Sequence, residues 1–415
     1  MLQALVVAVF LASSAAQQFS PENKFTFNPF DVSLYLKSAR MAEVNPREQE
    51  KVAKQVKFPC FLDKSPQVPD RVDRLRPGDV AVVAAMGDSL IAGNGAMAGN
   101  AFGSFIESRG VSWAAGGDGD WHSFLTLPNI LKEMNPNLTG YSQGSAEFLT
   151  PVSALNVAFP ISADSSAVNQ AKTLVARMRQ MLGKRYATDW KLVTILFGAN
   201  DLCTGQCYNA RGSSPSAHAY NLRQALDYLQ DNMPRAFVNL VSALDVTVSV
   251  RLKRSMVCRI IHRFFCSCYH MISNPLETMA RMARLYQKHE KQLIESGRYN
   301  VKPDFTVVIQ PFFTAYNMPL DEKHKLQEVI DISYITYDCF HFSQKGHALV
   351  ANMLWNNMLE PVGAKSTGKM KKMFDKFYCP TEENPYLFTT NNSIAFYKTG
   401  RQDGLKKIVI KKKLL

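Results

Sequence analysis

Three residues of this chain, brought together, could hydrolyse an ester through a covalent intermediate. Ser89 lies in the tetrapeptide Gly-Asp-Ser-Leu, directly after the apolar run VAVVAAM, and Asp338 and His341 lie three residues apart far downstream. A serine hydroxyl attacks only when a base accepts its proton, and that base needs a partner that holds it in one tautomer. We predict Ser89 as nucleophile, His341 as general base and then acid, and Asp338 as its orienting carboxylate.

Each half of this constellation also has an ordinary structural interpretation. The tetrapeptide occurs in strand-to-helix turns without chemistry, and Asp338 and His341 alone could be a surface acid and a capping histidine. The nearest rival base, His347, falls inside a predicted helix, and we interpret it as structural. The motif differs from the G-x-S-x-G elbow, which argues against an α/β-hydrolase fold.

Two further segments could stabilise the negative charge of the intermediate. Gly198-Ala199-Asn200-Asp201 offers the side-chain amide of Asn200, and Gly116-Gly117-Asp118 offers flexible backbone amides. An oxyanion hole needs two or three donors that converge on one point. Asn200 and the backbone amides of Gly116 and Gly117 are therefore candidate donors.

Alternating strands and helices must position these residues. We expect strands at Val80–Met86, Val111–Ala115, Lys191–Phe197, Val246–Leu252 and Phe305–Gln310. We expect helices at Ala167–Leu182, Ala217–Leu244 (broken at Pro234), Leu276–Ser296 and Gln344–Leu359. Apolar strands between amphipathic helices predict an α/β fold with a parallel sheet covered on both faces, whose ligands bind beyond the carboxyl ends of the strands. Ser89 and Asn200 both follow such ends.

The chain divides into four predicted regions. Residues 1–16 are uncharged, contain a short apolar run and end in Ser-Ala-Ala, which predicts a cleaved secretory signal peptide, with an uncleaved anchor as the alternative. Residues 17–76 form a polar N-terminal arm, 77–363 the hydrolase domain, and 364–415 a basic C-terminal extension.

Export agrees with the cysteine usage. The eight cysteines are an even number, which favours disulfides in an exported chain. Cys266-x-Cys268 could instead bind a metal, but its spacing fits zinc sites poorly. Asn137-Leu138-Thr139 and Asn391-Asn392-Ser393 match the glycosylation sequence. We predict a secreted protein.

A net charge of +13 favours anionic surfaces, although a basic secreted protein can be merely soluble. No nucleic-acid module is recognisable, so lipid is the better specific partner. The basic and aromatic segment Arg251–His270 is either a lipid-facing loop or a disulfide-pinned insertion with a solvated face.

The motifs occur in an order that resembles the SGNH, or GDSL, hydrolases, and most closely their phospholipase B branch. The resemblance runs from about Phe58 to Ser393 and includes VVAAMGDSLIAGNGA, WAAGGDGD, DWKLVTILFGANDLC and DCFHFSQKGHALVANMLWNNMLEPVG. It departs from the pattern at Ile91, where threonine is common, and in having one set of motifs rather than tandem repeats with a membrane anchor.

The resemblance implies a flavodoxin-like three-layer α/β/α domain that needs no cofactor and no metal. It implies the triad Ser89, Asp338 and His341, and an oxyanion hole made by the backbone amide of Ser89 with Gly117 and Asn200. The implied activity is deacylation of glycerophospholipids and lysophospholipids at a membrane or micelle surface, by a protein that we expect to be a monomer. The alternatives are a secreted esterase of small or glycan esters and a non-catalytic lipid-binding relative.

Overall fold

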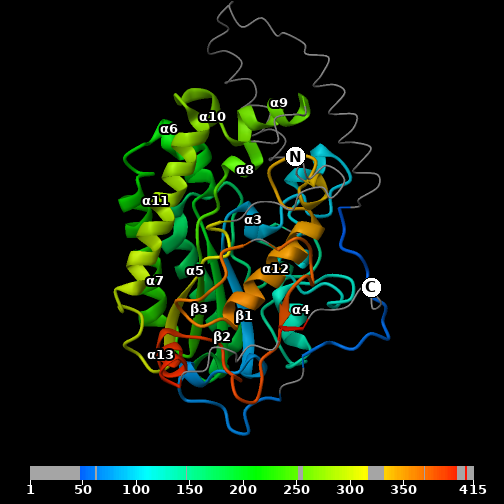
Figure 1. Ribbon diagram of the computed structural model, residues 1–415, viewed down its shortest axis with the longest axis vertical. Helices are drawn as coiled ribbons and strands as arrows, with labels where there is room; N and C mark the ends of the chain where they lie inside the picture. The colour runs from blue at the N-terminus through cyan, green and yellow to red at the C-terminus, as the bar shows by residue number, and fades with distance from the viewer. Residues whose placement is uncertain are drawn as a thin grey trace, which may run out of the picture.

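Four parallel strands form the centre of the molecule, as the computed structural model shows (Figure 1). The structure describes residues 47–60, 63–145, 147–250, 256–315, 331–368, 370–399 and 407–408. The strands lie in the order β1 (Val80–Gly87), β2 (Trp190–Leu196), β3 (Ala236–Val241) and β4 (Phe305–Gln310). Parallel pairing places all four carboxyl ends at one edge of the sheet, where Ser89 and Asn200 follow β1 and β2.

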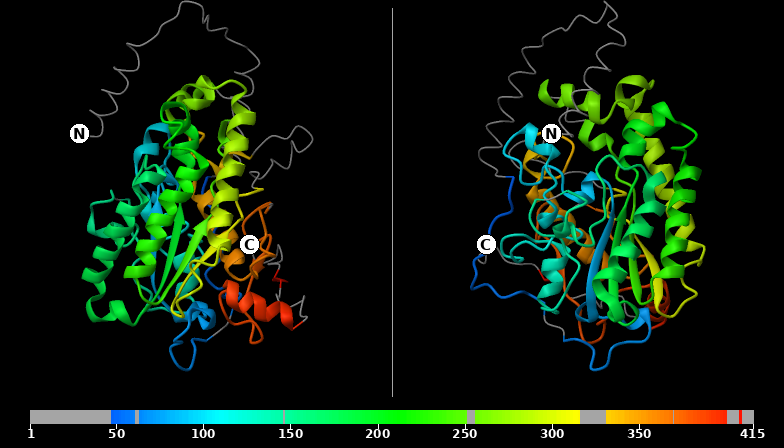
Figure 2. Two further views of the ribbon diagram at one scale, coloured as in Figure 1. Left: turned by 90° about the vertical axis from the view of Figure 1, so that its left-hand side faces the viewer. Right: turned by 180° about the vertical axis from the view of Figure 1, so that it is seen from behind.

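Alternate residues of each strand enter two separate cores, because successive side chains point to opposite faces. Val82, Val193 and Val238 pack with α5 (Ala167–Leu182) and α7 (Pro215–Asn232). Helix α11 (Pro275–Glu295) packs against α7 on the same side and contacts β4. On the other face, Val83, Leu192 and Phe237 pack with α12 (Gln344–Met358) and α4 (Leu127–Lys132). Figure 2 shows helices on both sides of the sheet. The predicted three-layer α/β/α architecture is confirmed.

Shorter elements surround this sandwich. They are the helices α3 (Ser89–Ala92), α6 (Gln206–Tyr208), α8 (Thr247–Val250), α9 (Met256–Phe265), α10 (Cys268–Met271) and α13 (Thr390–Lys398), and the antiparallel pair β5 (Phe377–Tyr378) and β6 (Lys407–Ile408). Helices α8, α9 and α10 lie beyond the carboxyl edge of the sheet, on the side of the predicted site (Figure 1).

Two of the five predicted strands are wrong. Val111–Ala115 is an apolar run that is buried without strand pairing, because Trp113 donates its backbone N–H to His347 and its indole N–H to the carbonyl of Leu90. In the range Val246–Leu252, the helix α8 begins at Thr247 instead of a strand. The carboxylate of Asp245 accepts hydrogen bonds from the backbone N–H and the hydroxyl of Thr247 and so caps the first turn. Residues 251–252 lie outside the described residues.

The structure also contains a strand that the pattern assigned to a helix. The predicted helix Ala217–Leu244 ends at Asn232, just before Pro234, and Ala236–Val241 forms β3 in the centre of the sheet. Its sequence AFVNLV is apolar on both faces, so its periodicity does not separate a buried strand from a helix. Arg235 turns the chain between them with a φ of 50°. The other three helices agree within one residue at each end.

The N-terminal arm and the C-terminal extension both contribute to the core. Val52 and Phe58 of the arm and Phe374 and Phe377 of the extension are buried in the same apolar cluster. A disulfide joins the two regions at Cys60–Cys379. The predicted signal peptide, residues 17–46 of the arm and the final residues 409–415 lie outside the described residues. No described helix is long and apolar enough to span a bilayer.

Candidate active site

The predicted nucleophile, Ser89, lies in the tight turn between β1 and α3. Gly87 ends β1 with a φ of 154°, and a Cβ built on it would lie 2.4 Å from the carbonyl oxygen of Leu196. Only glycine therefore fits beside the neighbouring strand. Asp88 then caps α3, with its Oδ1 accepting the N–H of Leu90 at 2.9 Å. This turn places Ser89 as the first residue of α3, at the carboxyl edge of the sheet.

The other two predicted residues meet Ser89 in a continuous hydrogen-bonded chain. His341 Nε2 lies 2.8 Å from Ser89 Oγ, and His341 Nδ1 lies 2.7 Å from Asp338 Oδ2. All three side chains are buried: Ser89 is 5% exposed, His341 4% and Asp338 0%. The arrangement can therefore move a proton from the hydroxyl to the imidazole while the carboxylate holds the ring.

Asp338 is held in its charged form by its surroundings. Burial raises the pKa of a carboxyl group, but here the charge and hydrogen bond of His341 and the hydroxyl of Thr336 outweigh it, and the pKa of Asp338 falls well below its usual value. Its Oδ1 also accepts the backbone N–H groups of Phe340 and His341 at 2.9 and 3.0 Å. Asp338 can therefore stabilise an imidazolium without taking its proton.

The side chain of Asn200 is fixed by a hydrogen bond at the carboxyl edge of the sheet. Asn200 follows β2, and its side-chain amide donates to the carbonyl of Ser162 at 2.9 Å. The segment before Ser162 is tied to the nucleophile turn, because Phe159 donates its N–H to the carbonyl of Gly87 at 3.1 Å. Ser162 thus orients the amide of Asn200, a contact that no sequence motif indicated.

The backbone N–H of Gly117, the other predicted donor, already has a partner. It donates to the carbonyl of Ser142 at 2.8 Å, and no described contact joins it to Ser89, Asn200 or His341. A Cβ at this position would lie 2.1 Å from the ring of Tyr141, so close packing accounts for the glycine. The predicted backbone donor is therefore engaged elsewhere.

Replacing Asn200 by alanine tests its role as a donor. We expect kcat on a soluble ester to fall by about 10²–10³-fold, because one oxyanion donor is lost while the triad remains. Steady-state kinetics and thermal unfolding should be measured together. Asn169→Ala, at an exposed asparagine on α5, is the matched control. An unchanged kcat in Asn200→Ala would contradict the assignment.

Beneath Asn200 lies a buried ionic network that the sequence did not reveal. The ring nitrogens of His218 lie 2.7 Å from Asp164 Oδ2 and 2.9 Å from Glu290 Oε1. Burial alone would lower the pKa of His218, but the two carboxylates outweigh it and raise the pKa to about 10. His218 is thus an imidazolium at neutral pH. The carboxylate of Asp201 joins the network by accepting the N–H of Asp164 at 3.0 Å.

His347, the rival base considered from the sequence, is held as a neutral group. His347 lies in α12 and is 1% exposed, and its Nδ1 accepts the backbone N–H of Trp113 at 3.2 Å. Burial, aided by the charge of His341, lowers the pKa of His347 to about 3. Its environment is that of a core residue.

Two disulfides connect the segment after Asn200 to the helices above the site. Cys203 pairs with Cys266 and Cys207 with Cys268. The predicted use of Cys266 and Cys268 in disulfides is confirmed, and the metal alternative is excluded for this pair. At the end of α9, the ring of Phe265 lies edge-on to His341 with 5.7 Å between centroids. The disulfide-pinned insertion therefore contacts the predicted base directly.

Comparison with known proteins gives a consistent result. The family model GDSL-like Lipase/Acylhydrolase matches residues 83–354. The protein "Phospholipase B1, membrane-associated" of Rattus norvegicus is 39% identical over 389 residues, 90% of this chain and 26% of that protein. Its namesake of Homo sapiens is 39% identical over 364 residues, 85% of this chain and 25% of that protein. This chain thus spans about a quarter of the length of these relatives.

Among solved structures, an acetylxylan esterase of Geobacillus stearothermophilus matches 65% of this chain and 90% of its own. The identity is 13% and the TM-score is 0.32, which is too low to bear on function.

Proposed function

This chain belongs to the GDSL-like lipase/acylhydrolase family, and we propose that it is a carboxylic ester hydrolase that deacylates glycerophospholipids and lysophospholipids through an acyl-enzyme. The observation that carries this proposal is the hydrogen-bonded chain from Ser89 through His341 to Asp338. The similarity to phospholipase B1 proteins over most of this chain supports the choice of lipid esters.

The proposed reaction has two halves. Ser89 Oγ attacks the acyl carbonyl and passes its proton to His341 Nε2, and the amide of Asn200 stabilises the oxyanion. His341 then gives this proton to the leaving alcohol oxygen, which departs as a lysolipid, or as a glycerophosphodiester when the substrate is a lysophospholipid, and leaves the acyl group on Ser89. In the second half, water attacks the acyl-enzyme while His341 acts as base, and the fatty acid is released.

Exposed apolar side chains near the site support a substrate that is part of a lipid aggregate. We define the apolar rim as Phe102, Phe105, Ile106, Phe159, Ile161 and Ile260. Phe102 is 87% exposed and Ile161 is 81% exposed, and the other four are between 44% and 55% exposed. Large apolar side chains gathered around a catalytic site are typical of a surface that contacts another apolar phase.

Contacts link the rim to the catalytic residues. The ring of Phe105 lies 6.2 Å from that of Phe265, which itself packs against His341. On the other side, Ile161 directly precedes Ser162, whose carbonyl holds Asn200. A bilayer or micelle that contacts the rim would thus bring its ester bonds to Ser89. The net charge of +13 would favour an anionic surface.

Replacing Phe102 by serine should separate lipid contact from chemistry. We expect binding to vesicles of phosphatidylcholine and phosphatidylglycerol to weaken about tenfold. The variant lacks the favourable free energy of transferring the aromatic ring from water to the lipid. Hydrolysis of soluble p-nitrophenyl butyrate should change much less. Val301→Ser is the matched control, because Val301 is 73% exposed in the loop before β4, at the opposite edge of the sheet.

The same experiment distinguishes the alternatives. An unaltered chain that hydrolyses p-nitrophenyl butyrate but neither binds nor hydrolyses phospholipid vesicles would favour an esterase of small or glycan esters. A chain that binds vesicles and hydrolyses neither substrate would be a lipid-binding relative. We propose secretion on the basis of the N-terminal sequence and the disulfides.

A further inference from the structure

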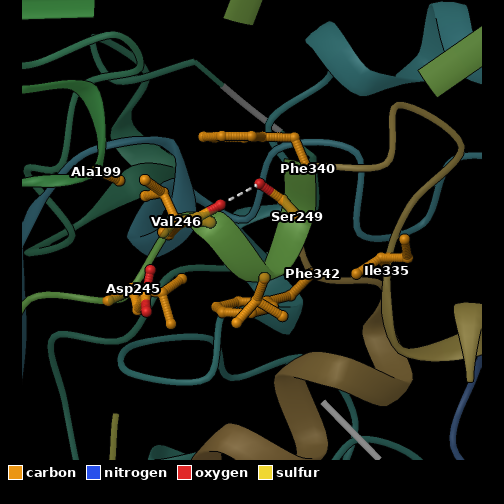
Figure 3. Close-up of a pocket in the computed structure, with 10 residues that line it drawn as sticks. Ala199, Asp245, Val246, Ser249, Ile335, Phe340 and Phe342 are labelled. Carbon is orange, nitrogen blue, oxygen red and sulfur yellow. Dashed lines mark hydrogen bonds between the residues drawn. The ribbon is translucent and has the colours of Figure 1, made fainter. Parts of the chain in front are cut away.

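An apolar pocket lies beside the triad, and the insertion after β3 forms one of its walls. Val246, Val248 and Ser249 line it from α8 and the residue before this helix, and Phe340 and Phe342 line it from the turn that carries His341. Figure 3 shows Val246 and Ser249 between these two rings, with Ser249 donating its hydroxyl to the carbonyl of Val246 at 2.8 Å.

The pocket shares its backbone with the catalytic machinery. Leu90, which lines it, follows Ser89, and Ala199, on another side, precedes Asn200. Phe340 and Phe342 flank His341 in the same way. A group that extends from a carbonyl held between Ser89 and Asn200 would therefore find this cavity within a few ångströms.

Resting on the proposed lipid-esterase function, we propose that this pocket receives the first part of the acyl chain and that α8 sets which chains fit. No lysine or arginine lines the pocket within the described part of the chain. Its charged lining residue is Asp245, whose carboxylate accepts two hydrogen bonds from Thr247. A hydrocarbon chain suits these walls, whereas a phosphate would be repelled by Asp245.

Because α8 forms this wall, side chains there can be replaced without changing Ser89, His341 or Asp338. The insertion is anchored at its far end by the disulfides of Cys266 and Cys268 to the segment after Asn200. Val246 and Val248 are buried, at 2% and 7% exposed, so this wall is packed against the core and is not a loose loop. Ser249 is half-buried and faces the pocket, which leaves room for a change in size there.

Ser249→Trp tests the proposal by filling the pocket. The measurement is the ratio of kcat/KM for p-nitrophenyl decanoate to that for p-nitrophenyl acetate, which share a leaving group and differ in acyl length. We expect Ser249→Trp to lower this ratio at least about tenfold, because the longer chain loses its apolar contacts. Ser249→Leu, a smaller change, should lower it less and covers the case in which the tryptophan variant does not fold. Val301→Trp is the control and should leave the ratio unchanged.

Two results would overturn the proposal while leaving the esterase function intact. One is an active Ser249→Trp or Ser249→Leu protein with the ratio of the unaltered chain. The other is a change that follows the length of the alcohol at constant acyl group, which would make the cavity a leaving-group pocket. Failure of the proposed function is distinguishable, because the unaltered chain would then hydrolyse neither ester, or Ser89→Ala would hydrolyse both.

Discussion

Replacing Ser89 by alanine is expected to lower kcat/KM on soluble esters and on phospholipids by about 10⁴–10⁶-fold. The loss is this large because the attacking oxygen disappears. His341 and Asp338 remain, but they have no hydroxyl to activate. The hydroxyl lies 2.8 Å from His341 Nε2 and is 5% exposed, so its removal should disturb the fold little. Steady-state kinetics with both substrate classes give the measurement.

A fluorophosphonate probe provides an independent reading of the same residue. It should label the unaltered chain at Ser89 and leave Ser89→Ala unlabelled, with equal thermal unfolding temperatures. Ser296→Ala, at an exposed serine after α11, is the matched control and should keep full activity and labelling. Wild-type phospholipid turnover by Ser89→Ala would show that another residue is the nucleophile.

The second large effect concerns Asp338, where Asp338→Asn should reduce kcat by about 10⁴-fold. An amide at this position no longer carries the charge that stabilises the imidazolium, and it can favour the wrong tautomer of His341. The triad distance of 2.7 Å between His341 Nδ1 and Asp338 Oδ2 should persist, since the side chains have similar shapes. The kinetics of a soluble ester, measured in the pH range in which the protein stays folded, provide the test.

The acid stability of the same variant gives a separate readout. The folded-state pKa of Asp338 lies well below the ordinary aspartate value of 3.8, so the ionised carboxylate stabilises the fold above that pH and loses this contribution as the pH falls toward the folded-state pKa. Below about pH 4, the free energy of unfolding of Asp338→Asn should therefore decrease less than that of the unaltered chain. Asp231→Asn, at an exposed carboxylate, is the control. A 10⁴-fold loss without any change in acid sensitivity would mean that Asp338 is not held as a carboxylate.

The meeting of Ser89, His341 and Asp338 was predictable because their chemistry depends on residue type and local spacing. Asp338 and His341 lie in one turn, so their contact is largely local, and a small-residue turn after a buried strand marked Ser89. Three of the four sheet strands carry the short, mainly apolar runs that are typical of buried parallel strands. These features are visible in short windows of sequence.

The errors arose where long-range contacts decide the structure. Val111–Ala115 is as apolar as a strand, but hydrogen bonds from Trp113 to distant partners hold it as an irregular segment. Gly117 was assigned to the oxyanion hole, yet its N–H pairs with Ser142 in the structure. Likewise, Ser162 and His218 act through partners 38 or more residues away, which a single sequence does not reveal.

The paired disulfides near Asn200 bear on how preparations of this protein should be handled. Cys203–Cys266 and Cys207–Cys268 join the segment after Asn200 to the segment that follows α9. A chain made in a reducing cytoplasm would carry Ser89, His341 and Asp338 and still lack these disulfides. Low turnover of such material would therefore reflect missing disulfides. Its free thiols should be titrated before its activity is compared with that of other esterases.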